Sequence, residues 1–285
     1  MTQMRKELAV TEETTLLPFL LREVTGKSRN TVKGLLTRRQ VMVDGAVITR
    51  FDAPLRPEAA GAAELPFSVL YQDRDLIAVD KPAGLLSMGN EKERARTAYR
   101  MVSDYVKARE PGGRIFIVHR LDRDTSGVLV FAKNERMKRA LQDHWEALVQ
   151  KRGYVAAVEG DLPEPEGTVR SYLRETTTHL VYSAPRGKEG REAVTHYRVL
   201  ARGKGFSLVE VNIDTGRKNQ IRVHMQDLGC PVAGDRQYGA QSDPMGRLAL
   251  HAHVLRFTDP RSKKTLELKA SLPLGFQKLF PGAEQ

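Results

Sequence analysis

The spacing of apolar residues divides the chain into a short N-terminal region and a longer region that follows it. Apolar residues at helical spacing predict two short helices, at 16–20 and 32–36, followed by a strand at 41–43 and a turn at Asp44-Gly45. The next stretch, DAPLRPEAAGAAELP, is rich in alanine and proline and has no sustained period, so it predicts a linker that ends near Pro66. We therefore expect two domains, a small module at 1–62 and a larger domain at 63–285.

Beyond the linker, the pattern predicts short strands and three helices. A hairpin is expected from Val69–Tyr71 and Leu76–Val79, and further strands at Ile115–Val118, Val128–Ala132, Tyr154–Val158, Ala193–Leu200 and Phe206–Ile213. The helices are expected at about 91–109, from the N-cap Asn134 to Leu148, and from Asn219 to Leu228, where Gly-Cys-Pro follows. Many connections have hairpin length, which favours an α+β fold with a mixed, largely antiparallel sheet over alternating βαβ units.

The charge balance indicates what kind of partner the chain binds. The sequence has 46 Lys+Arg against 35 Asp+Glu, a formal net charge of +11. A field of this sign raises the local concentration of phosphate backbones, so a nucleic acid is the leading candidate. A solvated basic surface that only keeps the protein soluble would have the same composition.

Cysteine usage and hydropathy indicate the compartment. Cys230 is the single cysteine of the sequence, which excludes an internal disulfide and a multi-cysteine zinc site and fits a reducing compartment. The N-terminal residues include early acidic residues and no long apolar run, unlike a signal peptide. No stretch reaches the roughly 18 apolar residues of a membrane span. We expect a cytoplasmic monomer that does not enter a membrane.

The segment HRLDRDTSG, residues 119–127, places acidic and basic side chains in a turn between two apolar strands. Such a turn can aim the carboxylates of Asp122 and Asp124 into a cleft. A tight turn in which Asp124 and Ser126 bond their own backbone explains the same pattern without any function. Taken alone, the segment favours this structural interpretation.

The other motifs change that interpretation. HRLDRDTSG matches the pattern His-Arg-Leu-Asp-x-x-Thr-Ser-Gly of the RluA-type RNA pseudouridine synthases at every specified position. Further blocks fall in the order of that family, namely LYQDRDLIAVDKPAGL, YVAAVEG, TGRKNQIRVH and LALHA. The chain therefore resembles this family from about Val69 to Pro273, and the resemblance implies the pseudouridine synthase catalytic fold.

The resemblance also implies a mechanism and a set of site residues. Asp122 would be the catalytic carboxylate, Arg222 its ionic partner, and Tyr154 the residue that contacts the target base. The residues implied to bind substrate are Arg120, which would hold the flipped nucleotide, His119, Thr125, Arg217 and Leu250. Converting uridine to pseudouridine is a redox-neutral isomerisation, so no cofactor and no metal is expected, and a carboxylate suffices as nucleophile or base. Whether Asp122 forms an adduct with the sugar, forms one with the base, or removes a sugar proton stays open.

An ionised carboxylate in a closed pocket needs a cation beside it, which is the part implied for Arg222. Three segments depart from the family pattern: Lys218-Asn219, Arg152 and Met88-Gly89-Asn90. They stand where the family has Thr-His, lysine and Val-His. We expect them to alter local RNA contacts and to leave the three catalytic residues untouched.

The N-terminal module resembles a degenerate S4 RNA-binding domain. Residues 16–20, Ser28-Arg29 at a helix start and 41–45 carry this resemblance. Gln40 stands where glycine is usual, and a final turn and strand are hard to find in PLRPEAAGAAEL, so we expect a shortened module. Its basic residues, which predict a groove for phosphates, are Lys27, Arg29, Lys33, Arg38 and Arg39.

Two other functions remain as alternatives. The first is a non-catalytic RNA-binding or assembly factor on the same fold, and the second is an RNA glycosidase in which Asp124 activates water. His251 and His253 share a strand face, but no carboxylate or cysteine stands at matching spacing, so we expect no metal site there. The resemblance implies a structured RNA, either rRNA or tRNA, as the target, and the choice of RNA in this chemistry depends on shape and unpaired bases rather than on a local sequence code.

Overall fold

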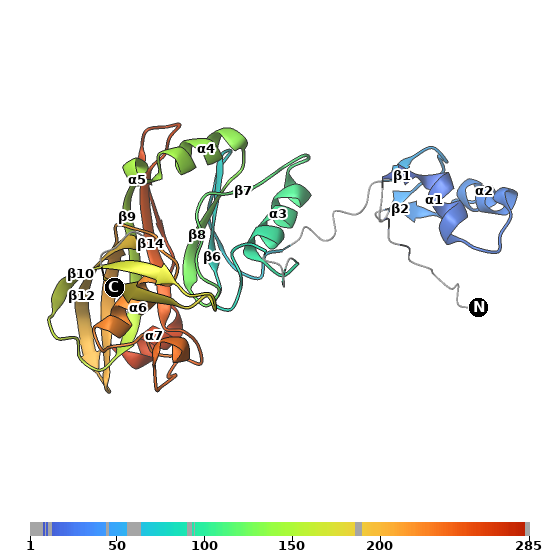
Figure 1. The fold of residues 1–285 in the computed structure, drawn as a ribbon. Coiled ribbons are helices and arrows are strands. Elements are labelled where there is room, and N and C mark those ends of the chain that lie inside the picture. Colours follow the sequence, from blue (N-terminus) through green and yellow to red (C-terminus); the bar gives the residue numbers. More distant parts are fainter. Residues whose placement is uncertain are drawn as a thin grey trace. The chain divides into compact units, whose positions relative to one another are not determined.

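The computed structural model describes residues 8, 10, 13–43, 46–55, 64–89, 93, 95–185 and 190–282. The chain divides into two compact units, Met1–Glu64 and Leu65–Gln285 (Figure 1). None of the helices in the described ranges has the length and apolar character needed to cross a membrane.

The described part of the N-terminal unit is a small helical unit with short strands. Helices α1 (Leu16–Glu23) and α2 (Arg29–Thr37) pack together around buried leucines and Val32. The short strands form two antiparallel pairs, β1 (Thr14–Thr15) with β4 (Pro54–Leu55) and β2 (Met42–Val43) with β3 (Ala46–Val47). The linker prediction is wrong at its first residues, because Pro54–Leu55 form strand β4 and Leu55, only 3% exposed, belongs to the apolar cluster of this unit. Residues 56–63 of that predicted linker and the predicted turn at 44–45 lie outside the described residues.

The larger unit contains one sheet of eleven strands among its described residues. The order is β11-β10-β12-β13-β9-β14-β8-β6-β5, with β7 paired to β8 and β15 paired to β14. Among the described strands of this sheet only β14 and β8 run parallel, which confirms the predicted α+β fold with a mixed, largely antiparallel sheet. The strands are β5 (Val69–Gln72), β6 (Leu76–Lys81), β7 (Phe116–Ile117), β8 (Ser126–Ala132), β9 (Val149–Glu159), β10 (Glu166–Glu175), β11 (Val181–Ala184), β12 (Arg191–Gly203), β13 (Phe206–Ile213), β14 (Leu250–Thr258) and β15 (Thr265–Lys269).

Strands β6 and β8 are buried on both faces. One face, with Leu76 and Val130, packs against α4 (Glu135–Asp143), and the other, with Ile77 and Phe131, packs against α3 (Ala98–Arg109). Two-sided burial explains why both strands are nearly continuous apolar runs in the sequence rather than alternating ones. The loop that carries Asp122 leads directly into β8, so its C-terminal end is anchored in one of the best-packed strands of the sheet.

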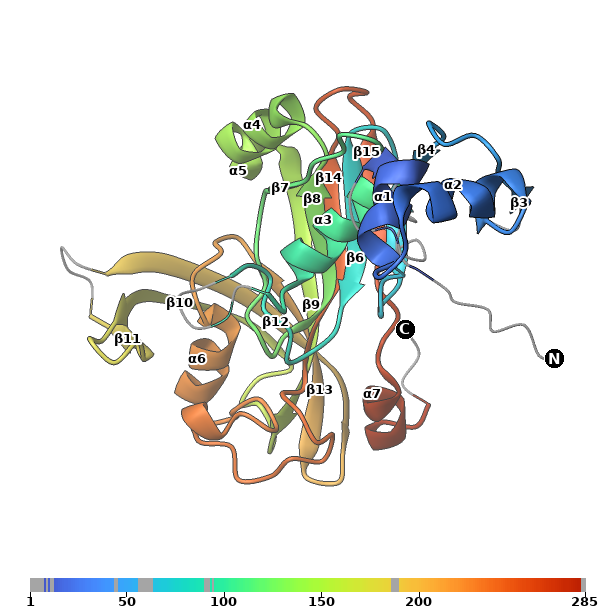
Figure 2. The same cartoon turned by 90° about the vertical axis from the view of Figure 1, so that its right-hand side faces the viewer.

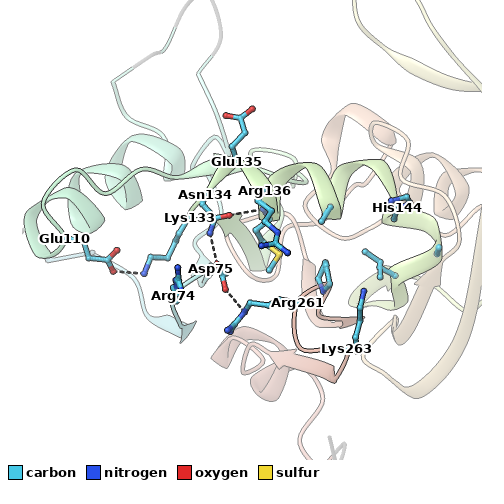
Figure 3. Close-up of a pocket in the computed structure, with 15 residues that line it drawn as sticks. Arg74, Asp75, Glu110, Lys133, Asn134, Glu135, Arg136, His144, Arg261 and Lys263 are labelled. Atoms are coloured by element: carbon cyan, nitrogen blue, oxygen red, sulfur yellow. Dashed lines mark hydrogen bonds and ion pairs between the residues drawn. The ribbon is translucent and has the colours of Figure 1, made fainter.

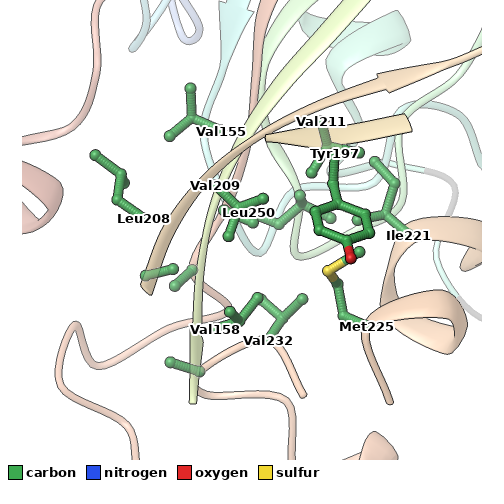
Figure 4. Packing of buried hydrophobic residues seen from close by; sticks show 14 of the residues in the cluster. Val155, Val158, Tyr197, Leu208, Val209, Val211, Ile221, Met225, Val232 and Leu250 are labelled. Carbon is green, nitrogen blue, oxygen red and sulfur yellow. The ribbon is translucent and has the colours of Figure 1, made fainter. Parts of the chain in front are cut away.

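The second half of the sheet packs against α6 (Gln220–Asp227). Ile221 and Met225 of this helix lie against Val209, Val211 and Tyr197 from the sheet (Figure 4). The same helix contacts β11 and β12 (Figure 2). Because α6 is held by its apolar side, Arg222 has a defined position beside the sheet.

Several predicted elements differ from the structure at their ends. Helix α3 starts at Ala98, where the side chain of Thr97 accepts the N–H of Arg100, rather than near residue 91. The long helix predicted from Asn134 is interrupted at His144 and continues as α5 (Trp145–Leu148). Asn134 is confirmed as an N-cap, because its Oδ1 accepts the N–H of Met137 at 2.9 Å.

Several elements of the larger unit were not predicted. Strand β10 has the sequence EGTVRSYLRE with Leu173 as its one buried residue, so its pattern contains little apolar signal. The short elements β11, β15 and α7 (Leu274–Leu279) are also absent from the prediction. These elements are stabilised by neighbours that are distant in sequence, which explains why local patterning did not reveal them.

Gly127 lies where β8 meets β14. Its φ is 113°, and a Cβ built there would overlap the backbone of Ala252. Glycine is therefore required both by the backbone conformation and by the close approach of the two strands.

We expect Gly127→Ala to lower the free energy of unfolding by at least about 2 kcal/mol, because it combines backbone strain with overpacking. Gly203→Ala is the matched control, since Gly203 has no positive φ and a Cβ added there would meet no atom within 4 Å. Urea denaturation of both variants measures the difference, and equal midpoints would contradict the constraint.

Candidate active site

The backbone on both sides of Asp122 is fixed by side chains from the β6 region. Lys81 is fully buried, and its Nζ donates to three carbonyls, those of Pro82 (2.9 Å), Leu85 (2.7 Å) and Arg123 (3.0 Å). The Ser87 hydroxyl donates to the Leu121 carbonyl at 2.7 Å and accepts the Leu121 N–H at 3.1 Å. The Lys-Pro-Ala-Gly turn and the Asp122 loop are therefore one hydrogen-bonded structure. The sequence contained this signal, since the lysine lies in a matching block, but no role was predicted for it.

The charge of Lys81 depends on the carboxylates beside it. Burial lowers the pKa of Lys81 to about 7, and the negative charges of Asp124 and Asp122 oppose this shift. The buried ammonium is therefore favoured when the two loop carboxylates are ionised.

Asp122 is a partly buried carboxyl group surrounded by cations. Burial raises the pKa of Asp122, while the charges of Arg222 and Arg120, the backbone of Asn219 and the charge of Lys218 lower it. The balance leaves the pKa above its ordinary value. Perturbation of this kind by desolvation and specific charges is typical of a functional carboxylate.

Arg222 does not form the direct ion pair with Asp122 that the sequence predicts. Its Nε and Nη2 donate to the Asp235 carboxylate at 2.6 and 2.7 Å. Nη1 donates to Asn219 at 3.0 Å, and the guanidinium lies 4.7 Å from the centre of the Tyr238 ring. Asp235 is only 2% exposed, so it needs this bidentate partner more than the partly buried Asp122 does. Arg222 acts on Asp122 through its charge, which lowers the Asp122 pKa.

The prediction that the family departures leave the catalytic residues untouched is wrong. Asn219 is the N-cap of α6 with a φ of 55°, a left-handed conformation that asparagine tolerates better than most residues. Its side chain accepts from Arg222 and donates to the Tyr238 hydroxyl at 3.0 Å, and its backbone lowers the pKa of Asp122. Lys218 pairs with Glu175 at 2.6 Å and also acts on Asp122.

Tyr154 lies on β9 near Asp122. Burial raises the pKa of Tyr154 to about 12; the charge of Arg152 opposes this shift and that of Asp122 adds to it. The phenol is therefore neutral at physiological pH. Tyr154 lines a cavity of about 20 Å³ together with His119 and Arg152, which is room for about one water and too little for a nucleobase. Arg152 also donates to the backbone carbonyl of Asp214 and is the second of the three departing segments to lie at the site.

His119, predicted to contact the substrate, is held by a hydrogen bond and by ring stacking. Its Nε2 accepts the backbone N–H of Val130 at 3.0 Å, and its ring stacks on Trp145 with centroids 5.2 Å apart. Burial, followed by the charge of Arg152, lowers the pKa of His119 to about 4, so the ring is neutral.

The other predicted substrate residues fall into two groups. Thr125 and Leu250 are buried, at 2% and 3% exposure, and contribute to the turn and to the apolar core. Arg120 is exposed beside Asp122, and the half-buried Arg217 donates through Nε to the Glu192 carbonyl at 3.0 Å. Asp124, the rival carboxylate, forms a bidentate pair with Arg123 at 3.0 and 3.2 Å. Arg120 is the exposed residue among the predicted substrate residues, whereas Thr125 and Leu250 are buried.

The basic residues of the predicted phosphate groove lie in the N-terminal unit, where Lys27 is exposed just before α2. Arg29 and Lys33 are exposed on α2, and Arg38 and Arg39 are exposed just after it. The Ser28 hydroxyl caps α2 by accepting the N–H of Thr31 at 3.2 Å. The cap places Arg29 and Lys33 on an ordered helical surface.

His251 and His253 are accounted for by hydrogen bonds. The Ala270 carbonyl accepts from His253 at 2.7 Å and lies 3.4 Å from His251, whose Nδ1 is 2.8 Å from the Ser126 hydroxyl. Across the part of the chain that the structure describes, no group of three or more His, Cys, Asp or Glu residues forms a metal-binding cluster.

We expect Asp235→Ala to lower the free energy of unfolding by about 3–5 kcal/mol, because it leaves the Arg222 guanidinium buried without its carboxylate. Asp214→Ala, which removes an exposed carboxylate from its pair with His196, should cost less than about 1 kcal/mol. Thermal and urea denaturation measure both values. Equal losses would show that Asp235 does not stabilise Arg222.

Comparison with known proteins identifies the family. Residues 75–227 match the model of the RNA pseudouridylate synthase family. The ribosomal large subunit pseudouridine synthase D of Xanthomonas campestris pv. campestris is 36% identical over 238 residues, which cover 78% of this chain and 70% of the relative. The tRNA pseudouridine synthase C of Haemophilus ducreyi is 33% identical over 237 residues, covering 76% and 95%.

Solved structures show the same fold. The human RNA pseudouridylate synthase domain containing 4 superimposes with a TM-score of 0.62 at 24% identity, covering 74% of this chain and 92% of that one. The matched segment of the family model includes the Asp122 loop, Tyr154 and Arg222. The chain therefore belongs to the RluA-type RNA pseudouridine synthases, isomerases that convert uridine in RNA to pseudouridine.

Proposed function

We propose that this protein isomerises specific uridines in structured RNA, either rRNA or tRNA, with Asp122 as the catalytic carboxylate and without a cofactor. The observation that supports this best is the position of Asp122, a partly buried carboxyl group in a rigid loop with Arg222, Arg120 and Lys218 close enough to lower its pKa. The relatives named for rRNA and for tRNA substrates support both target classes.

The reaction breaks the N1–C1′ bond of uridine and forms a C5–C1′ bond. The proton lost from C5 is balanced by one gained at N1, so atoms and electrons balance without a redox partner. Asp122 assists by adding to the sugar, adding to the base or removing a sugar proton, and each route requires the ionised form. The nearby arginine and lysine charges favour that form against the effect of burial.

Tyr154 and Arg120 have different parts in this proposal. The neutral phenol of Tyr154 offers an aromatic face for the uracil and a hydroxyl for proton transfer. Arg120, exposed next to Asp122, holds the RNA open around the flipped nucleotide, since a stacked base cannot reach a carboxylate in a loop. Arg217 is the remaining candidate for a substrate contact.

The N-terminal residues 1–62 act in this proposal as a shortened S4-like RNA-binding module attached to the catalytic domain 63–285. The exposed Arg29, Lys33, Arg38 and Arg39 support phosphate binding by this module. We also propose that the enzyme works as a cytoplasmic monomer.

The test is the comparison of Asp122→Asn with Asp124→Asn on total RNA from a host that lacks this gene. We expect Asp122→Asn to lower the rate of pseudouridine formation by at least about 10²–10⁴-fold, and Asp124→Asn to retain most of it. Pseudouridine mapping identifies the modified sites. Full activity of Asp122→Asn would refute the assignment, and release of free uracil by the wild type would indicate a glycosidase.

The pH profile provides a second test. Because the pKa of Asp122 is raised, kcat/KM should rise with pH through a limb above the ordinary range of an aspartate. Lys218→Gln removes a charge that lowers this pKa and should move the limb upward by less than about one pH unit. Lys107→Gln, on an exposed position of α3, is the control and should leave the limb in place. A downward shift for Lys218→Gln would contradict the role of its charge.

A further inference from the structure

A groove of about 1060 Å³ lies apart from the Asp122 loop in the larger unit (Figure 3). The start of α4, helix α5, the β5–β6 turn and the β14–β15 turn form its walls. Its apolar lining includes Met137, Leu148 and Pro260. This volume is at the upper end of the range of about 300–1,000 Å³ for small-molecule pockets, and much of the charged rim is exposed, so the groove suits a segment of a polymer.

The acidic residues of this groove already have partners. Asp75 pairs with Arg261 at 2.6 Å, and Glu110 pairs with Lys133 at 2.5 Å. Glu135 is 3.4 Å from Arg139, one turn along α4 and outside the groove, and 3.9 Å from Lys138.

Three cations of the groove remain without a carboxylate. Arg74, Arg136 and Lys263 are exposed, and none of them forms an ion pair within the described residues. They come from three different elements, so their side chains surround the groove rather than follow one helix face (Figure 3). The groove therefore has an excess of positive charge after its internal pairs are counted.

The groove and the Asp122 loop lie at opposite ends of shared strands. The loop enters β8 at Ser126, and the groove begins at Lys133 just after the same strand ends. Strand β6 likewise starts at Leu76, directly after Asp75 of the groove, and ends at Lys81 beneath the loop. The seven residues of β8 set a separation of roughly 20 Å, the rise of about six nucleotides along a helical strand.

We propose that this groove binds the sugar–phosphate backbone of the RNA substrate at a distance from the reacting uridine. The inference rests on the proposed RNA-modifying function and adds to it a second contact point. Arg74, Arg136 and Lys263 bind phosphates, and the apolar floor contacts the riboses. RNA fits better than an acidic peptide, because the cations are spread around an open groove and the enzyme already holds RNA at the other end of the strands.

The test uses a variant with three changes, Arg74→Gln, Arg136→Gln and Lys263→Asn. The control carries Lys107→Gln, Lys278→Gln and Lys204→Asn, which removes the same charge from exposed positions outside the groove. Lys204 matches Lys263 because both have a positive φ, 55° and 59°, that asparagine tolerates. Equal melting temperatures check that both variants fold.

The probes are a labelled oligouridylate of about 30 nucleotides and an RNA duplex of about 20 base pairs, titrated across salt concentrations. We expect the groove variant to bind at least one probe roughly tenfold more weakly, with a salt slope smaller by about 2. The probe that responds shows whether single-stranded or duplex RNA occupies the groove.

An unchanged slope with both probes, or the same reduction in the control variant, would overturn the proposal. The outcome is separate from that of the proposed function. If the groove variant keeps the wild-type salt slope, the groove proposal fails while the wild type still forms pseudouridine. If the wild type forms no pseudouridine, the proposed function fails, whatever the salt slopes are.

Discussion

The parallel contact between β8 and β14 at Gly127 is the constraint on which the rest of the larger unit depends. It joins the two halves of the sheet, and a side chain at Gly127 would overlap the backbone of Ala252. The same contact is reinforced by the Ser126 hydroxyl, which lies 2.8 Å from His251 and accepts from Arg247 at 2.7 Å. Because Asp122 lies only a few residues before this junction, the position of the carboxylate is set by strand packing rather than by the loop alone.

The charges of the site are arranged around the competition between two carboxylates for one guanidinium. Asp235, the more deeply buried of the two, accepts hydrogen bonds from Arg222. Asp122 is affected by the positive charge of Arg222, which lowers its pKa. Lys218 and Asn219 lower the pKa of Asp122 as well, so residues that differ from the family pattern lie beside the candidate carboxylate.

Much of the fold, and the loop that carries the candidate carboxylate, could be predicted from local patterns. The buried strands β8 and β13 have strong apolar runs, and Asn134 was recognisable as an N-cap because its chemistry acts within one turn. Strand β10 was missed because it has one buried residue, Leu173, and depends on β11 and β12 for its hydrogen bonds. Helix α4 ends at His144 although the apolar spacing continues, so local spacing did not reveal the interruption.

The sequence by itself determined the family, the α+β class and the candidate carboxylate, because ordered motifs and apolar spacing are local properties of the chain. Only the tertiary structure decided which side chains contact one another. It paired Arg222 with Asp235, stacked His119 on Trp145 and placed Lys81 beneath the loop. Which side chains pair depends on how close folding brings residues that are apart in the sequence, and on how deeply it buries them. Electrostatic effects become strong only where folding removes water from around the charges.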